Sequence, residues 1–190
     1  MTHKDKNVEI TLHQRPNLQG SVDLVRIDQV YHDMPLECFL EMAFKDAKPD
    51  HAKEYRDLGV SEDGESQILY FRAKIPFMSE REVIIRMKRE NLDDGSAIVI
   101  MRSMAEHKDV PINPKYIRNE MMIARWIRPL KENPKHLEVI HFGLVDPKGY
   151  FPGRLFNMVI PSLMTKTVKT WHKKATAIKE RWIKEGKIEN

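Results

Sequence analysis

The 190-residue sequence contains one cysteine, Cys38, so it cannot form an intramolecular disulfide bond. A chain without disulfides suits a reducing compartment. The first residues, MTHKDKN, contain no apolar signal region. No stretch approaches the roughly 18 apolar residues that a membrane-spanning helix needs. We therefore expect a cytoplasmic protein, or a cytoplasmic part of a larger protein.

Catalytic and nucleic-acid-binding signatures are also missing. The sequence holds no His-Glu-x-x-His, Gly-x-Ser-x-Gly or Gly-x-Gly-x-x-Gly motif and no phosphate-binding loop. The net charge is only +4, from 32 basic and 28 acidic residues, and acidic residues lie near most of the basic ones. An RNA-binding pattern of aromatic and basic residues is absent. We expect no catalysis, no cofactor, no metal and no nucleic-acid partner.

Alternating apolar residues predict several β-strands. Residues 8–16 (VEITLHQRP) and 22–31 (VDLVRIDQVY) alternate on either side of a polar turn, which predicts a hairpin. A second hairpin is predicted at 82–104, where two β-branched runs flank an Asp-Asp-Gly turn. Residues 66–77 predict a further strand, and 116–145 predict another pair of strands joined by a loop that contains proline.

Helical spacing marks two other regions. Residues 34–45 (MPLECFLEMAFK) repeat apolar side chains at helical intervals, and 48–59 are expected to form a short helix or a turn. From Phe151 onward the sequence predicts a long final helix, which Pro161 is expected to kink or interrupt. Its second half, from Pro161 to Asn190, carries eight Lys or Arg and three Glu, a net charge of +5.

This order of elements predicts an α+β fold in one domain, residues 1–190. A curved antiparallel sheet that grips one long helix leaves a space between the two layers. Such a space suits an apolar ligand.

Two stretches resemble a known family. KIPFMSEREVIIRM, residues 74–87, is similar to a strand-turn-strand of steroidogenic acute regulatory protein-related lipid transfer (START) domains. VIHFGLVDPKGYFPGRLFN, residues 139–157, resembles their C-terminal hallmark of an aromatic strand, Asp-Pro-x-Gly, and a proline before the last helix. Residues 102–104 (RSM) look like the phosphatidylcholine transfer protein branch. The resemblance covers roughly residues 8 to 180, and the family's usual N-terminal helix looks missing or trimmed.

The resemblance implies a helix-grip fold, in which the sheet and the C-terminal helix enclose a hydrophobic tunnel. It implies that the protein holds one lipid, a phosphatidylcholine-like phospholipid or a sterol, and transfers it between membranes by transient peripheral contact. The basic end of the last helix would meet anionic headgroups, or would simply be a solvated face.

Arg81 is the main candidate for lipid recognition. The resemblance implies that it points into the tunnel, where a guanidinium can bind a phosphate or a sterol hydroxyl. Its acidic partner stays open among Glu62, Asp63 and Glu65. Its neighbours in sequence, Glu80 and Glu82, are expected to be turn and outward-facing residues. The competing interpretation is that Arg81 is a solvated turn residue.

Other expected lipid contacts come from the strands and the last helix, with ordinary core packing as the competing interpretation. They are Tyr70, Met101, Met122, Trp126, His141, Phe156, Ile160 and Met164. In particular, Met122 and Trp126 share one face of a strand, which makes that face a candidate cavity wall.

Two other functions remain open. One is a helix-grip hydrolase or cyclase that uses His141 as general acid or base. The other is a lipid-sensing module of a larger protein. A polar dyad inside the cavity would favour the enzyme, whereas an apolar tunnel with one arginine would favour lipid transfer.

Overall fold

The computed structural model describes residues 2–4, 7–45, 48–49, 52–74 and 79–189. Its elements in chain order are β1 (Thr2–Lys4), β2 (Val8–Arg15), β3 (Leu24–Tyr31), α1 (Leu36–Lys45), β4 (Ala52–Val60), β5 (Ser66–Ala73), β6 (Arg81–Asn91), β7 (Ala97–Met104), β8 (Ile117–Arg118), β9 (Glu120–Leu130), β10 (Asn133–Asp146) and α2 (Gly153–Lys184).

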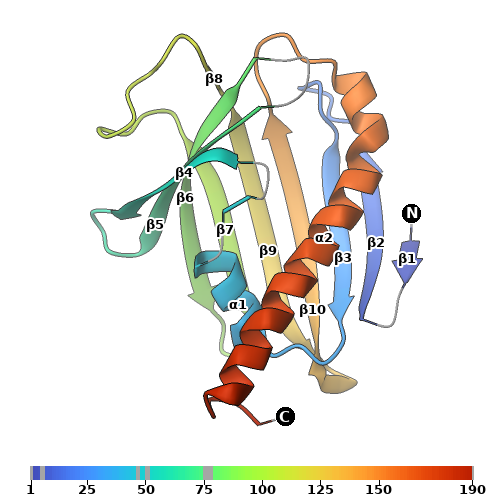
Figure 1. The fold of residues 1–190 in the computed structure, drawn as a ribbon. Helices are drawn as coiled ribbons and strands as arrows, with labels where there is room; N and C mark the ends of the chain where they lie inside the picture. The colour runs from blue at the N-terminus through green and yellow to red at the C-terminus, as the bar shows by residue number, and fades with distance from the viewer. Residues whose placement is uncertain (1, 5–6, 46–47, 50–51, 75–78, 190) are drawn as a thin grey trace.

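The strands form one curved sheet. Its order is β1-β2-β3-β10-β9-β7-β6-β5-β4, with neighbours antiparallel, and the short β8 runs parallel to the start of β6. Figure 1 shows α2 crossing the sheet diagonally, with α1 close to its C-terminal half. An ion pair between Arg181 of α2 and Glu41 of α1 joins the two helices. The α+β helix-grip arrangement is thereby confirmed.

Both predicted hairpins and the predicted β9–β10 pair are present. The prediction for residues 48–59 is wrong, because Ala52–Val60 forms strand β4 rather than a helix or turn. Among the described strands, β4 lies at an edge of the sheet and pairs with β5 alone, across two register shifts. An edge strand needs little apolar content, so the alternation that marks the central strands is weak here.

The final helix runs without interruption through Pro161, contrary to one of the two predicted outcomes. Proline cannot donate the hydrogen bond that would reach the carbonyl of Asn157, four residues earlier. Gln14 of β2 takes that role, since its Nε2 donates to the Asn157 oxygen at 2.9 Å. The Asn157 side chain also donates to Asp23 Oδ1 at 2.8 Å. The sheet therefore stabilises α2 where the helix's own bonding is broken.

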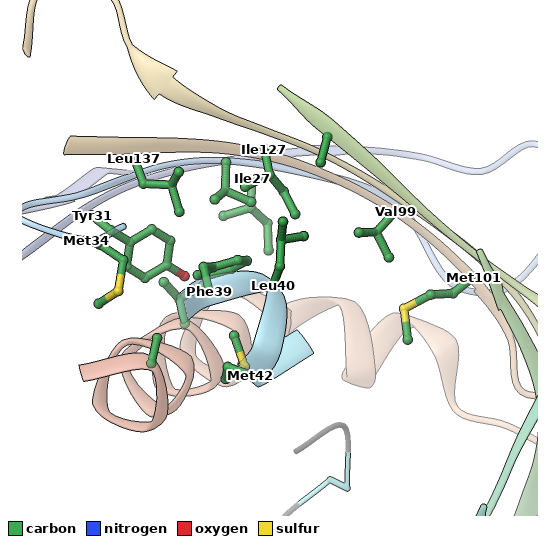
Figure 2. Packing of buried hydrophobic residues seen from close by; sticks show 14 of the residues in the cluster. Ile27, Tyr31, Met34, Phe39, Leu40, Met42, Val99, Met101, Ile127 and Leu137 are labelled. Carbon is green, nitrogen blue, oxygen red and sulfur yellow. The ribbon is translucent and has the colours of Figure 1, made fainter. Parts of the chain in front are cut away.

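The main hydrophobic core lies between the concave face of the sheet and the two helices. Figure 2 shows Ile27, Ile127 and Leu137 pointing from the sheet toward Phe39 and Leu40 of α1. A smaller cluster, Ile68, Tyr70, Ile84 and Val110, packs on the convex face. Side chains of the sheet therefore divide into an inner set that faces α2 and an outer set that faces away.

Candidate functional site

Strand alternation sorts the predicted lipid contacts onto two faces. Those on the inner side, where they belong to the main core or pack against it, are Met101, Phe156, Ile160 and Met164. His141 also faces inward, because its ring lies 5.8 Å from the ring of Trp171 on α2. These five residues lie where the sequence placed them, and their contact with lipid stays a prediction.

The other three candidates lie on the outer face, so the prediction that they line the interior is wrong. Tyr70 belongs to the convex cluster, and Met122 is 53% exposed. Trp126 donates from Nε1 to Ser96 Oγ at 3.0 Å and carries the guanidinium of Arg128 on its ring at 4.1 Å. On β9 the inward phase belongs instead to residues 121, 123, 125 and 127. Both phases of this strand are rich in apolar residues, so alternation alone could not identify the inward one.

Arg81 is buried at the start of β6 and is engaged by backbone carbonyls. Its guanidinium donates to Ser79 at 2.7 Å and to Pro147 and Tyr150 at 3.2 Å. Its Cζ lies 5.4 Å from the ring centre of Phe151. Burial lowers the pKa of Arg81. The two stretches that carry the family resemblance therefore meet here, because Arg81 from the first fastens the segment before α2 in the second. A headgroup role for Arg81 stays a prediction and would compete with these bonds.

None of the acids proposed as partners of Arg81 contacts it in the described structure. Asp63 forms an ion pair with Arg86, and Glu65 forms one with Lys88 at 2.6 Å. The Pro-Phe-Met part of the expected turn, at 76–78, lies outside the described residues.

The two glutamates beside Arg81 have different roles. Glu80 pairs with Arg72 and Lys53. Glu82 faces outward as expected, but it is buried and pairs with Arg118 at 2.6 Å.

A polar cluster that the sequence did not identify lies on the inner face, where β3, β10 and β9 adjoin. Arg125 of β9 stands directly opposite His141 of β10 and donates from Nε to His141 Nδ1 at 3.2 Å. The guanidinium also lies over the ring of Trp171 on α2, with Cζ 4.4 Å from the ring centre. No carboxylate pairs with Arg125 among the described residues. Burial lowers its pKa to about 10, so the side chain still carries its charge near neutral pH.

Two residues of β3 complete this polar cluster. The Tyr31 hydroxyl donates to Gln29 Oε1 at 2.6 Å, and burial raises the pKa of Tyr31. The other end of the same amide, Gln29 Nε2, is buried and lacks a hydrogen-bond partner among the described residues. We use the name interior polar cluster for Arg125, His141, Gln29, Tyr31 and Trp171.

The environment of His141 does not support acid–base catalysis. Burial and, to a smaller extent, the charge of Arg125 lower the pKa of His141 to about 3. An imidazole with such a pKa stays neutral near pH 7 and is a weak base. An enzyme would be favoured by a pair of His141 with an acid or a nucleophile. The partner of His141 in the structure is instead a cation, Arg125.

The same pKa shift predicts a change in acid stability. An unfolded histidine takes up a proton near pH 6.5, whereas folded His141 does so only near pH 3. The unfolded state therefore binds the extra proton within this window, and stability falls as pH drops from about 6.5 toward 3. In the wild type, His141 alone should lower the free energy of unfolding by up to about 1.4 kcal/mol for each pH unit below 6.5. We expect His141→Gln to abolish this contribution. Denaturant unfolding of both proteins between pH 7 and 4.5 measures the difference, and equal pH slopes would contradict it.

A set of apolar side chains on the inner side is only partly buried, although it packs against the core. We call it the inner apolar surface. Its members are Tyr55, Phe71, Met121, Ile123, Phe156 and Met164. It extends from the strands at one end of the sheet to the N-terminal half of α2.

A groove of about 520 Å³ that is open to solvent also follows α2, and its described lining residues carry hydroxyl or ammonium groups. The lining residues are Ser162, Thr165, Lys166, Lys169, Thr170 and Lys173. This groove is therefore not the apolar tunnel that the resemblance implies.

The described residues contain neither a metal-binding group nor a membrane-spanning helix. No group of three or more His, Cys, Asp or Glu is placed to hold a metal ion. No helix of the described part is long and apolar enough to cross a membrane.

Arg125 and Gln29 carried a signal that sequence reasoning missed. Each is a polar residue in the apolar phase of a central strand: Arg125 lies between Ile123 and Ile127, and Gln29 lies between Ile27 and Tyr31. A charged residue in a buried phase is rare unless it has a partner, and this rarity could have identified Arg125.

The family model described as START domain matches residues 59–181, more than half of the chain. No match was found among curated proteins.

Solved structures share the fold at low sequence identity. The crystal structure of human STARD10 has a TM-score of 0.76 and 17% identity, covering 96% of this chain and 75% of that chain. Human StAR-related lipid transfer protein 5 has a TM-score of 0.73 and 17% identity, covering 93% of this chain and 86% of that chain. A StAR-related lipid transfer protein from Xanthomonas axonopodis has a TM-score of 0.73 and 15% identity, covering 93% and 98%.

Proposed function

This chain belongs to the START domain family, and we propose that it binds one lipid between the sheet and α2 and carries it between membranes. The names of two similar structures describe lipid transfer proteins, which supports this function. The protein would act as a carrier, and the lipid would leave chemically unchanged.

The inner apolar surface is the observation that carries this proposal. Large apolar side chains that remain partly accessible on the concave side of a sheet give a lipid tail something to cover. Each Å² of apolar surface removed from water contributes roughly 25 cal/mol. Covering this surface and the tail together is the driving force for binding. The ligand is a phospholipid or a sterol-sized lipid, since both have the long apolar part that this surface needs.

Contact with a membrane would begin at the N-terminal end of α2. Four large side chains there are exposed: Tyr150 at 92%, Leu155 at 65%, Met158 at 73% and Val159 at 51%. Exposed apolar groups gathered over such a short segment mark an interaction surface. The basic residues farther along α2 add attraction to anionic lipids. The same end of the helix contributes Phe156 to the inner apolar surface, so docking and lipid entry would occur at one place.

Placing acidic residues on this exposed segment is expected to weaken membrane contact. We expect Leu155→Asp combined with Met158→Asp to reduce co-sedimentation with anionic vesicles by about tenfold, because each change removes apolar burial and adds repulsion. Both side chains point to solvent, so the fold should persist. The matched control is Leu18→Asp with Ile112→Asp, which alters two exposed residues outside α2. Equal loss in both double variants would show that the segment has no special role.

Movement of lipid between vesicles tests the proposed function. Donor vesicles with a fluorescent phospholipid and a quencher are mixed with acceptor vesicles, and dequenching is followed with and without the protein. We expect a rate that rises in proportion to protein concentration. Transfer no faster than the spontaneous rate, for both a phospholipid and a sterol probe, would contradict the carrier function.

A further inference from the structure

We propose that the interior polar cluster binds the acidic headgroup, a carboxylate or a phosphate, of the lipid carried by this protein. This inference rests on the proposed function and narrows its ligand to an anionic lipid. It assigns headgroup recognition to Arg125 on β9, with His141 and Gln29 beside it.

The hydrogen-bonding inventory of the cluster is the first argument. A guanidinium can only donate, so the bond from Arg125 Nε makes His141 Nδ1 an acceptor. In a neutral imidazole the proton then lies on Nε2. Gln29 Oε1 is already occupied by the Tyr31 hydroxyl, whereas Gln29 Nε2 has two N–H groups and no partner among the described residues.

The groups of the cluster that have no hydrogen-bond partner within the described chain are therefore all donors. It comprises the terminal N–H groups of Arg125, the Nε2–H of His141 and the amide N–H groups of Gln29. Within the described chain, Nε supplies the only hydrogen bond of Arg125. A buried cluster that offers donors and a positive charge lacks an acceptor with a negative charge. Carboxylates and phosphates supply both, and guanidinium binds them in a two-point geometry.

Burial makes the missing partner costly. Arg125 is 7% exposed, His141 5% and Gln29 1%. An isolated charge in an apolar interior is strongly unfavourable unless it is paired, and a buried amide without a partner is also unfavourable. An acidic headgroup would satisfy both groups at once.

The interior polar cluster lies next to the inner apolar surface, where the lipid tail is proposed to bind. On β9 the inward neighbours of Arg125 are Ile123, which belongs to the inner apolar surface, and Ile127, which is fully buried. Arg125 therefore lies where the partly exposed surface meets the closed core. A lipid with its tail on the inner apolar surface and its head inward would bring its polar atoms to this boundary.

Residue 143 places no side chain beside the donors. Gly143 follows His141 in the inward phase of β10, and a Cβ added there would lie 3.1 Å from His141 Nε2. The absence of a side chain at this position keeps the Nε2–H side of the ring uncovered by residue 143. Any larger residue would crowd the position that a headgroup oxygen would take.

The cluster also discriminates against other lipids. A sterol offers one neutral hydroxyl, which cannot balance the Arg125 charge. A choline group carries a cation, and the cluster provides a second cation rather than a carboxylate near it. The ligand class that fits is a lipid with an acidic headgroup and no attached positive charge.

The test compares lipids that differ only at the head. Binding of oleic acid is measured against oleyl alcohol, and phosphatidic acid against diacylglycerol, by displacement of a fluorescent fatty acid from the purified protein. We expect the acidic member of each pair to bind at least about tenfold more tightly. Arg125→Met should remove this preference and leave binding of the neutral members unchanged. Inorganic phosphate and acetate, added alone, identify a site that needs no lipid tail.

A matched control is Arg128→Met, which also removes an arginine of β9, but one on the outer face that already pairs with Glu138. We expect this variant to keep the preference for acidic lipids. Gln29→Leu, which removes the unpartnered amide, should weaken acidic binding and keep neutral binding.

The outcomes separate the two claims. If neutral and acidic members bind equally, or if Arg125→Met keeps the preference, the headgroup proposal is wrong and lipid carriage stands. If no member of either pair binds, the headgroup proposal is wrong. Lipid carriage fails with it only if the phospholipid and sterol probes also move no faster than the spontaneous rate. Binding of phosphate or acetate as tight as that of the acidic lipids would show an anion site unrelated to lipid. If Arg125→Met does not fold, Gln29→Leu and the wild-type comparison decide the outcome.

Discussion

Replacing Glu82 by alanine is expected to lower the free energy of unfolding by about 3–5 kcal/mol, because it breaks a buried ion pair from one side. Glu82 accepts two bonds from Arg118, at 2.6 and 3.1 Å, and one from the Tyr70 hydroxyl at 3.1 Å. Arg118 also donates to the carbonyls of Ala105 and Val110. Loss of the carboxylate leaves a poorly hydrated cation and a hydroxyl without their acceptor. Denaturant unfolding at pH 7 measures the effect.

The control for this change is Glu90→Ala on the same strand, where the carboxylate is exposed and pairs with Lys88 at 3.4 Å. Exposed ion pairs contribute little, so the control should unfold close to wild type. Arg118→Ala should cost about as much as Glu82→Ala, and the double variant should cost clearly less than their sum. A loss at Glu82 no larger than that at Glu90 would show that this contact does not stabilise the convex side.

Phe39→Ala is expected to cost about 3–5 kcal/mol of unfolding free energy, the usual range for a fully buried phenylalanine. Phe39 is the side chain of α1 that packs against Tyr31 of β3, with ring centres 5.0 Å apart. Figure 2 places it between the sheet and the helices. Its loss would leave a cavity that the surrounding strands and helices cannot fill. The free energy of unfolding by denaturant, monitored by tryptophan fluorescence, checks this expectation.

A phenylalanine with a different environment serves as its control. Phe142 lies on the convex face, 48% exposed, with Arg26 near its ring. Phe142→Ala should cost about 1 kcal/mol or less. Similar losses at Phe39 and Phe142 would mean that the core between the helices and the sheet is not packed as described.

Much of the fold could be predicted from sequence because central strands carry strong local signals. The hairpins of β2–β3 and β6–β7 have clear alternation and turn residues, and both were predicted. Strand β4 was missed, because an edge strand with one paired neighbour does not need two apolar faces. The continuity of α2 through Pro161 could not be predicted either. The donor that replaces the missing proline N–H is Gln14, which lies 143 residues before Asn157, the residue whose carbonyl accepts the bond.

The site was harder to predict than the fold. Period-two alternation tells which residues share a face but not which face is inward. On β9 the sequence pattern places Trp126 on the inward face, whereas in the structure its neighbour Arg125 faces inward. The role of Arg81 depends on carbonyls of residues 147 and 150, which no local pattern reveals. Tertiary contacts of this kind decide which polar side chains have hydrogen-bond partners within the chain and which do not.

The most direct test of the central claim is to identify what the purified protein carries. The protein is isolated from cells without detergent, denatured in organic solvent, and its extract is examined by mass spectrometry beside that of an unrelated protein. The proposed function, with headgroup recognition by Arg125, predicts a lipid in close to equimolar amount, with an acidic headgroup enriched over neutral lipids. Protein that carries no lipid, and takes up none when incubated with vesicles of mixed acidic and neutral lipids, would contradict it.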